Sequence, residues 1–480
     1  MATNAAFLRY ASPNEMRTIA REDVGYYHAV VIGAVYDFTE EIDVKSPATY
    51  YHPLRRCIEE HPFFCVTVGD RNTDKAYYEH VSSINVEQHI SIVQDSEIGT
   101  DSLEAIGRSV KSELDRPFVS GIPPWRIVVL PLSATQCHVA FSFSHGIGDG
   151  IAGVAFHKTF LEGLRETPST ISSSTISPLK KSLPEPFDTP GRLSISWSFL
   201  LAPFLAQYIP YFLVKMLGLR VSASYVNEGT WTAGPIFFDA KTNENKLKIR
   251  QIEGSQVKKV VQLARTHDAR LTGVMHQLVA RALSKAVKDN NVTNFVGQTA
   301  INMRNSIGMS NNVATEAVSG CYTLHNRSEV TGPFSEQEWA SAREATKEFA
   351  IVAVKLDDNP IGLLRYVSSI REWTLGKIDK KRDSSYEFSN VGVFDGDAGS
   401  STVGKDKVKV TKMTFAQPGQ VGGCPISFNV ASVKGGDLVY TVTWQSGALG
   451  LGGDDSDEAM ENRLVEEICD DIKQGFNDIA

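Results

Sequence analysis

The sequence has few cysteines, no run of basic residues and no cofactor-binding fingerprint. Six of its 480 residues are cysteine, and they form neither a C-x-x-C pair nor a His/Cys cluster of zinc-finger spacing, so we expect reduced thiols and no metal site. Asp and Glu (56) outnumber Lys and Arg (48), and the formal net charge of −8 gives no electrostatic footprint for a nucleic acid. A P-loop and a dinucleotide-binding fingerprint are also absent from the sequence.

Extended apolar runs are scarce as well. The N-terminal residues MATNAAFLRYASPNEMRT lack the unbroken apolar core of a secretory signal, so we expect a cytoplasmic protein. One segment, 193–214, carries no charge and is long enough to raise the question of a membrane span, although Pro203, Gln207 and Pro210 interrupt it. Three interpretations stay open: a span, an interfacial helix in peripheral contact with an intracellular membrane, and, favoured narrowly, a surface packed against protein.

What the sequence does contain is an ordinary globular composition, with 42% hydrophobic and 22% charged residues. Because single hydrophobic cores stop growing beyond about 250 to 300 residues, two domains are expected. The chain becomes rich in Ser, Thr and Pro at about 165–190, a composition typical of a linker. We therefore expect an N-terminal domain over 1–185, a crossover linker with the apolar segment over 186–225, and a C-terminal domain over 226–480.

Strand-like and helix-like segments alternate in both halves of the chain, which predicts the α+β class. Helices are expected at 52–60, 103–115, 255–288 with an interruption near His267, and from Met460 to Phe476. Strands are expected at 28–38, 63–70, 122–132, 136–144, 295–302, 408–415, 426–433 and 438–444.

The richest candidate for chemistry is the stretch FSFSHGIGDGIAG at 141–153. Strand periodicity places Phe143 and His145 on one face, so the imidazole is expected to point toward the interior. Gly146, Gly150 and the glycine between them allow a sharp turn and a close ligand, and helical spacing follows them. The predicted layout is strand, glycine turn and helix, with His145 as the candidate catalytic residue and Phe143 as a candidate substrate contact.

The same motif has a purely structural interpretation. Asp149 is well placed to cap the following helix, which would leave His145 as a turn residue. A bare H-x-x-x-D is expected about once by chance in a chain of this length, so the spacing alone does not decide. The remaining histidines form no second pair of this kind, and His61, His138 and His276 are expected to be structural.

A wider likeness supports the catalytic interpretation. SHGIGDG resembles the H-x-x-x-D-G signature of CoA-dependent acyltransferases with the chloramphenicol-acetyltransferase-like fold, which include plant BAHD acyltransferases and peptide-synthetase condensation domains. Six further segments resemble, in order and spacing, the fungal alcohol O-acetyltransferase branch: GYYHAVVIGAVYDF, EEHPFFCVTV, PPWRIVVL, INMRNS, EFSNVGVFDG and PISFNVASVKGGDLVYTVTWQSGAL. Ser144 replaces the second histidine of condensation domains, and the D-F-G-W-G motif of BAHD enzymes is missing, so those two subfamilies fit less well.

The resemblance implies two similarly folded domains, each a mixed β-sheet flanked by helices, with an active-site tunnel between them. It implies that His145 is the general base, with acyl-CoA and acceptor entering from opposite sides. Asp149 would point away from the substrate and pair with an arginine of the second half, for which the matching position is Arg304 in INMRNS; a surface position for Arg304 is the alternative. Such a pair would hold the turn with Gly146 and Gly150 rigid.

Two further pairs of residues are weaker candidates. Ser389 and Asn390 in FSNVGVF precede a glycine, on an expected loop, and the resemblance places such a segment beside the tunnel; a turn without chemistry is the alternative. Lys258 and Lys259 could meet CoA phosphates, but a solvated helix face explains them better. The CoA-binding residues and the oxyanion donors therefore stay unassigned.

The expected function is transfer of an acyl group, above all acetyl, from acyl-CoA to a hydroxyl group of a small, rather apolar secondary metabolite or alcohol. The expected partners are acyl-CoA as cosubstrate and that acceptor; no bound cofactor and no nucleic acid are expected, and the protein is expected to be a monomer. A histidine with a pKa near its ordinary value of about 6.5 can accept the hydroxyl proton. Amide formation, a carrier-protein thioester as donor, and an inactive binding protein of the same fold are the alternatives.

Overall fold

The computed structural model describes residues 6–94, 101–166, 173–205, 223–398, 404–451 and 456–480. The first half contains β1 (Phe7–Tyr10), α1 (Pro13–Asp23), β2 (Val30–Phe38), α2 (Tyr51–Glu60), β3 (Val66–Gly69), β4 (Tyr77–His80), β5 (Ile84–Asn85), β6 (Ile90–Ile92), α3 (Ser102–Leu114), β7 (Trp125–Pro131), β8 (Gln136–Phe143), α4 (Gly150–Arg165), β9 (Thr175–Ile176) and α5 (Trp197–Leu205). The second half contains β10 (Asn245–Ile252), α7 (Gly254–Thr266), α8 (Leu271–Ala286), β11 (Asn294–Asn302), β12 (Val318–Asn326), α9 (Glu336–Val352), α10 (Ile370–Leu375), β13 (Tyr386–Phe394), β14 (Val408–Ala416), β15 (Ser427–Val433), β16 (Leu438–Gln445) and α11 (Ser456–Ile479).

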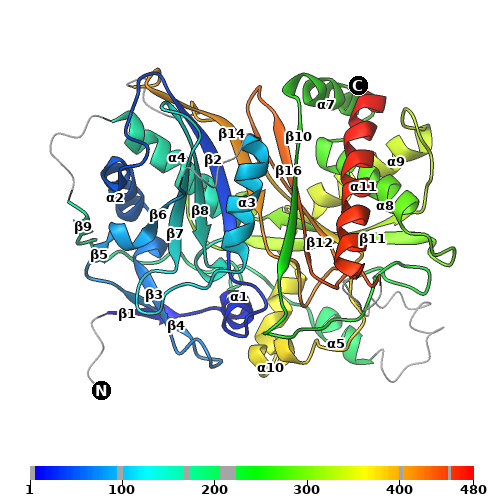
Figure 1. Ribbon diagram of the computed structural model, residues 1–480. Coiled ribbons are helices and arrows are strands. Elements are labelled where there is room, and N and C mark those ends of the chain that lie inside the picture. Colours follow the sequence, from blue (N-terminus) through cyan, green and yellow to red (C-terminus); the bar gives the residue numbers. More distant parts are fainter. Residues whose placement is uncertain (1–5, 95–100, 167–172, 206–222, 399–403, 452–455) are drawn as a thin grey trace.

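Two large sheets lie side by side, and each is flanked by helices (Figure 1). The first has the strand order β14-β2-β8-β7-β6, and the second has the order β10-β16-β15-β13-β11-β12. The second sheet mixes antiparallel pairs with the parallel pairs β11–β13 and β13–β15. The α+β class and the mixed sheets flanked by helices, both predicted from the sequence, are confirmed.

The strands of the first sheet are apolar on both faces because helices cover both. Along β2, Ile32 and Tyr36 join a core with residues of α2 and α4, whereas Val31 and Val35 join a second core with residues of α3. That second core also takes in Ile249 and other residues of the second half. The two halves are therefore joined by a shared apolar layer as well as by the chain.

One strand crosses between the halves. β14, which follows β13 of the second sheet along the chain, pairs antiparallel with β2 at the edge of the first sheet, for example Phe415 with Ile32. The domain boundaries at 185 and 225 stay a prediction. Domains that are each continuous in sequence do not account for the pairing of β14 with the first sheet. It also carries the loop after β14 into the space between the sheets.

The stretch from 165 to 190 behaves differently from the free linker that its composition suggested. Residues 167–172 lie outside the described residues, but β9 pairs with β5, and Ile176 and Phe187 are buried. Burial of apolar side chains such as these stabilises a segment that is otherwise polar. The stretch is thus anchored at these points, whereas Leu179 between them is 82% exposed.

The apolar segment 193–214 is described only as far as residue 205. It contains α5, on which Trp197 is 77% exposed and Leu201 is 41% exposed. The part from 206 to 214, which bears on all three interpretations of this segment, lies outside the described residues. No helix among the residues that the structure describes is both long enough and apolar enough to cross a membrane.

Candidate active site

His145 lies where the central strand β8 ends and a short 3-10 turn, His145–Ile147, begins. The side chain is 16% exposed and forms part of the wall of a cavity of about 330 Å³. Its ring meets the edge of the Tyr27 ring, with centroids 5.6 Å apart. Burial, together with the positive charges of Arg21 and Arg17, lowers the pKa of His145 to about 4, so the imidazole is neutral at the pH of a cell.

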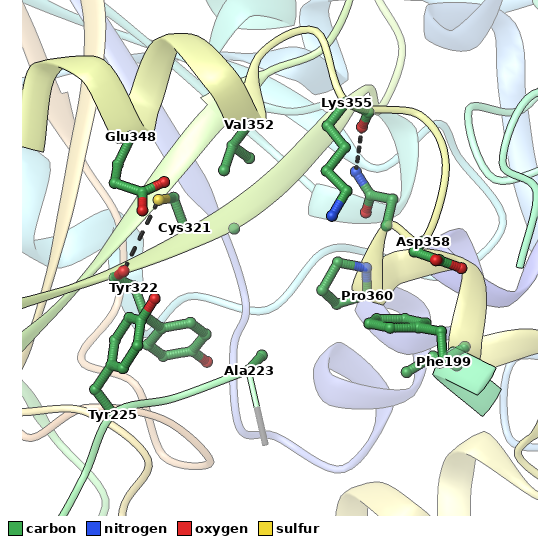
Figure 2. Close-up of a pocket in the computed structure, with 13 residues that line it drawn as sticks. Phe199, Ala223, Tyr225, Cys321, Tyr322, Glu348, Val352, Lys355, Asp358 and Pro360 are labelled. Carbon is green, nitrogen blue, oxygen red and sulfur yellow. Dashed lines mark hydrogen bonds between the residues drawn. The ribbon is translucent and has the colours of Figure 1, made fainter. Parts of the chain in front are cut away.

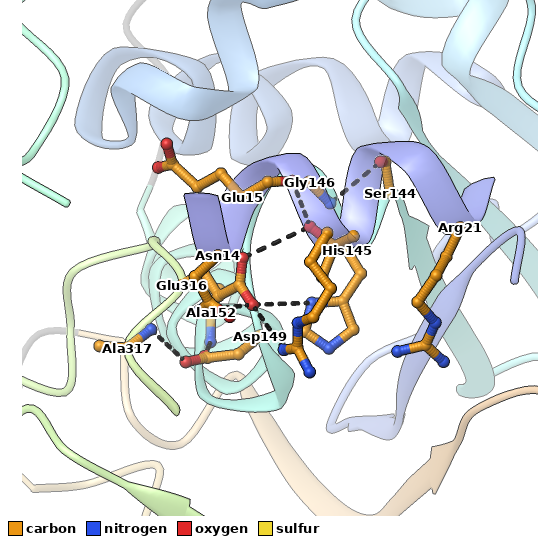
Figure 3. A network of polar contacts seen from close by, with 12 residues as sticks. Asn14, Glu15, Arg21, Ser144, His145, Gly146, Asp149, Ala152, Glu316 and Ala317 are labelled. Carbon is orange, nitrogen blue, oxygen red and sulfur yellow. Dashed lines mark hydrogen bonds and ion pairs between the residues drawn. The ribbon is translucent and has the colours of Figure 1, made fainter. Parts of the chain in front are cut away.

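Asp149 and Arg304 are brought together as a fully buried pair. Arg304 donates from Nη1 to Asp149 Oδ2 at 2.8 Å and from Nη2 to Asp149 Oδ1 at 2.9 Å, and Nη2 also donates to the Thr315 carbonyl at 2.7 Å. Asp149 accepts two further bonds, from the backbone N–H groups of Ala152 (3.1 Å) and Ala317 (2.9 Å) (Figure 3). The carboxylate therefore caps α4 and also ties the first half to the second. The surface alternative for Arg304 is wrong, since its side chain is 0% exposed.

The glycines of the turn act through close packing. A Cβ on Gly146 would lie 2.8 Å from Ile19 of α1, and one on Gly150 would lie 2.7 Å from Val391 of β13. Neither residue has a positive φ, so the need is for space and not for a left-handed backbone. Gly146 lets α1 approach the turn, and Gly150 lets the start of α4 approach the second sheet.

Glu316 is a neighbour of His145 that the sequence analysis missed. Its Oε1 lies 4.0 Å from His145 Nδ1 and accepts a hydrogen bond from Asn14 Nδ2 at 3.0 Å (Figure 3). Arg17 Nη2 lies 3.6 Å from the same carboxyl group. Burial raises the pKa of Glu316 well above its ordinary value, and Arg17 opposes that rise. The carboxyl group thus connects α1, the histidine turn and the segment before β12.

The cavity beside His145 draws its wall from both halves of the chain. It is lined by Val30, Ile151 and Tyr27 from the first half and by residues of β11, β12, β13, α10 and the loop after β14 from the second. Ser389 and Asn390 belong to this wall, but they lie within β13 and not on the predicted loop, because the β-ladder with β15 continues through them. Ser389 accepts a bond from Gln417 at 3.1 Å, and Asn390 donates to Thr272 at 3.3 Å.

Phe143 does not fit the substrate contact predicted for it. Its side chain is 0% exposed, stacks on Phe141 with ring centroids 4.8 Å apart, and belongs to the core between the first sheet and α2 and α4. It is not part of the cavity wall. The strand periodicity gave its face correctly, but that face points into the core until the chain turns at His145.

The histidines expected to be structural are buried and hydrogen-bonded. His61 bonds Thr159 at 3.0 Å, His138 bonds Thr414 at 3.0 Å, and His276 bonds Tyr386 at 2.7 Å and Thr299 at 3.0 Å. None of the three lines the cavity beside His145. Lys258 and Lys259 are exposed on α7, away from that cavity, as expected for a solvated helix face.

Comparison with known proteins now fixes the family. A family model described as alcohol acetyltransferase matches residues 93–450, well over half of the chain. The chain belongs to the alcohol acetyltransferase family. It is 23% identical over 456 residues to the probable alcohol acetyltransferase FCK4 of Fusarium pseudograminearum, across 89% of this chain and 86% of that one. This likeness agrees with the resemblance found in the sequence.

Solved structures share the fold of this acetyltransferase. TRI3 trichothecene 15-O-acetyltransferase from Fusarium sporotrichioides has a TM-score of 0.64 at 11% identity and is matched over 98% of this chain and 94% of its own. The starter condensation domain of rhizomide synthetase, in complex with C8-CoA, has a TM-score of 0.57 at 10% identity, over 98% and 94% of the two chains. The two-domain acyltransferase fold is therefore confirmed.

Figure 2 shows residues that line a second cavity, which has a volume of about 150 Å³ and shares lining residues with the first. It lies between β12, the end of α9 and the segment around Pro360, and Phe199 of α5 forms part of its wall. Gly320, Tyr322 and Pro360 line both cavities. The described residues contain no group of three or more His, Cys, Asp or Glu side chains that could hold a metal ion.

Proposed function

We propose that this chain catalyses CoA-dependent O-acetylation of a hydroxyl group on a small acceptor with an apolar body, and that His145 is the general base. The observation that supports this most directly is a neutral imidazole, with a pKa lowered to about 4, in the wall of a cavity between the two sheets. Apolar side chains of both halves, among them Val30, Leu364 and Phe415, supply the surface for such an acceptor.

The chemistry needs one proton to move twice. With Nδ1 turned toward Glu316, Nε2 is the nitrogen left to receive the proton of the acceptor hydroxyl. The acceptor oxygen bonds to the thioester carbonyl carbon as that proton leaves. The C–S bond then breaks, and the imidazolium returns the proton to the departing CoA sulfur, which leaves as a thiol. A neutral histidine is regenerated, so atoms and charge balance over one turnover.

Positioning is expected to contribute more than proton transfer. General-base assistance is typically worth about 10²- to 10⁴-fold, whereas holding two reactants in one geometry can lower a barrier by roughly 7 to 11 kcal/mol. Asp149, Arg304, Gly146 and Gly150 serve that purpose in this proposal, because they hold the turn that presents His145. Ser389 and Asn390 contact the substrates from β13.

The proposal is tested by incubating the purified protein with acetyl-CoA and a panel of alcohols and amines, and by following free thiol and acetylated product. We expect acceptor-dependent thiol release with alcohols. Release with amines alone would assign amide formation instead. If no acceptor in the panel gave thiol release from acetyl-CoA but a carrier-protein thioester supported transfer, the donor would be a carrier protein. Binding without turnover on any donor would leave a binding protein.

A further inference from the structure

Three positively charged side chains gather in the wall of the cavity beside His145. Arg17 and Arg21 lie one helical turn apart on α1, and Lys377 lies just after α10, which packs against α1. Like charges at this spacing on a helix repel each other, and burial in a shared cavity strengthens the repulsion. Such a grouping costs stability unless something of opposite charge compensates it.

The protein itself supplies little of that compensation. Arg21 donates to the side-chain oxygen of Gln420 and stacks over the Tyr27 ring at 4.6 Å, and Lys377 donates to the Gly422 carbonyl at 3.2 Å. Neither cation has a carboxylate within ion-pair distance in the part of the chain that the structure describes. Arg17 has Glu316 at 3.6 Å, but its buried Nε has no described partner.

Acidic groups of the wall are occupied elsewhere. Glu387 accepts hydrogen bonds from Gln417 at 2.7 Å and Ser389 at 3.1 Å, and Asp383 accepts one from Tyr322 at 3.2 Å. Burial raises the pKa of Glu387, as it does that of Glu316, which favours their neutral forms. Among the described residues, Glu316 beside Arg17 is thus the one carboxyl group within ion-pair distance of any of the three cations.

The cations lie close to the reacting centre. Arg21 covers the Tyr27 ring, and that ring meets the His145 ring at 5.6 Å between centroids. Arg17 reaches Glu316, whose Oε1 is 4.0 Å from His145 Nδ1. One intervening side chain therefore separates each arginine from the imidazole: Tyr27 for Arg21 and Glu316 for Arg17. The phosphates of CoA are held far from its thioester by the long pantetheine arm, so they cannot lie here while the thioester is at His145.

We propose that Arg17, Arg21 and Lys377 form an anion-binding wall for a carboxylate on the acceptor, so that the acceptor class is a hydroxy acid with an apolar body. This rests on the proposed acetyl transfer at His145. A carboxylate can take two parallel hydrogen bonds from one guanidinium, and such charge-assisted bonds fix orientation as well as affinity. The acid would anchor the acceptor at the wall while its hydroxyl group reaches His145.

Binding can be measured without turnover. The full chain is titrated calorimetrically with octanoate and, in parallel, with methyl octanoate, which has the same apolar chain and no charge. We expect octanoate to bind at least about tenfold more tightly, since hydrogen bonds to charged groups are the strong ones. Arg21→Met and Lys377→Met should each weaken octanoate binding about 10- to 100-fold and leave methyl octanoate nearly unchanged. Equal binding of acid and ester would overturn the proposal.

Kinetics then identify which substrate uses the wall. With 3-hydroxyoctanoate and its methyl ester as acceptors, we expect Arg21→Met to raise the KM for the acid and to leave the KM for acetyl-CoA unchanged. A rise in the KM for acetyl-CoA instead would assign the wall to the CoA phosphates and overturn the proposal. Arg265→Met, at an exposed position of α7, is the matched control and should change neither constant.

These experiments distinguish failure of the anion-binding wall from failure of the proposed acetyl transfer at His145. Octanoate binding that depends on Arg21, without acetyl transfer to any acceptor, would retain the anion-binding wall and remove the proposed enzymatic function. Transfer to neutral alcohols with no preference for an acid would do the reverse. Because α1 also packs against the histidine turn, thermal unfolding of each variant is compared first, and Lys377→Met, which is outside α1, gives a result even if Arg21→Met does not fold.

Discussion

Two charged regions border the same cavity, and they differ in how their charges are matched. Around Asp149 and Arg304, each carboxylate oxygen and each terminal guanidinium nitrogen has a partner within the protein, and the pair joins α4 to the segment before β12. Arg17, Arg21 and Lys377 are less fully matched: Glu316 lies 3.6 Å from Arg17, and the other partners are the Gln420 amide, the Gly422 carbonyl and two aromatic rings. Matched buried charges hold a shape, whereas unmatched charges at a cavity are available to a ligand.

The largest expected effect comes from removing the imidazole that lies between these regions. His145→Ala should lower turnover by about 10²- to 10⁴-fold, because it removes the proposed general base. The protein should still fold, since among the described residues His145 Nδ1 has no hydrogen-bond partner and reaches Glu316 only at 4.0 Å. Thiol release and thermal unfolding are measured together, with His52→Ala, a histidine outside the cavity wall, as the control.

Removing one cation from each charged region tests whether the two regions differ in their contribution to stability. Arg304→Ala should lower the free energy of unfolding by about 3 to 5 kcal/mol, because it leaves the Asp149 carboxylate buried and unpaired, and activity should fall with it. Asp149→Asn should harm stability and activity in the same direction. Arg21→Met should change the free energy of unfolding by less than about 1 kcal/mol, since it removes a poorly compensated charge.

Chemical denaturation of the variants decides between the two kinds of region. If Arg21→Met lost as much stability as Arg304→Ala, Arg21 would be a structural residue and the distinction would fail. If His145→Ala also lost an equal amount, the motif would be a structural turn and His145 would not be the base.

The sequence predicted the histidine turn well because the relevant signals are local. Strand alternation up to Phe143, the glycines and the helical spacing after Gly150 lie within one short stretch, and the structure has β8, a turn and α4 there. Most other predicted strands and helices also agree with the structure to within a few residues. Arg304 could be matched only through the family resemblance, because nothing local in INMRNS points to a partner 155 residues away.

The cationic wall was missed for a different reason. A local signal for α1 was present, since Ser12 and Glu15 form a capping box before the helix, and that helix places Arg17 and Arg21 on one side. Lys377 and the loop after β14 reach the same cavity only through long-range pairing, including the crossing of β14 to β2. Local periodicity carries no information about such contacts.

Glu316 lies beside Arg17, and replacing it shows whether Arg17 is a matched cation, like Arg304, or an unmatched one, like Arg21. Glu316→Ala should lower the free energy of unfolding by about 1 to 3 kcal/mol, because Asn14 and Arg17 lose a buried partner. Glu316→Gln keeps an acceptor for Asn14 and should recover most of that loss. If glutamine were as harmful as alanine in a thermal unfolding series, the charge itself would matter, and Arg17 would count as a matched cation.

The smallest expected effect is a pH dependence of acceptor binding. Burial, together with the charges of Arg21, Arg17 and Lys380, lowers the pKa of Lys377 to about 8, and Asp383 opposes this. Lys377 therefore loses its positive charge as the pH rises through about 8, while His145, with a pKa of about 4, stays neutral. Between about pH 7 and about pH 9, the KM for 3-hydroxyoctanoate should rise about two- to tenfold, within the range of one charge-assisted bond, and that for its methyl ester should not.

Lys377→Met separates this titration from every other alkaline effect. The variant should start from a higher KM for the acid at about pH 7 and show no further rise up to about pH 9, because its wall has no lysine left to discharge. A wild-type profile that was flat for the acid would place Lys377 outside the anion-binding wall, and the two arginines of α1 would then have to bind the carboxylate alone. A profile that rose equally for acid and ester would instead mean that the alkaline change lies in the apolar part of the cavity or in the protein as a whole.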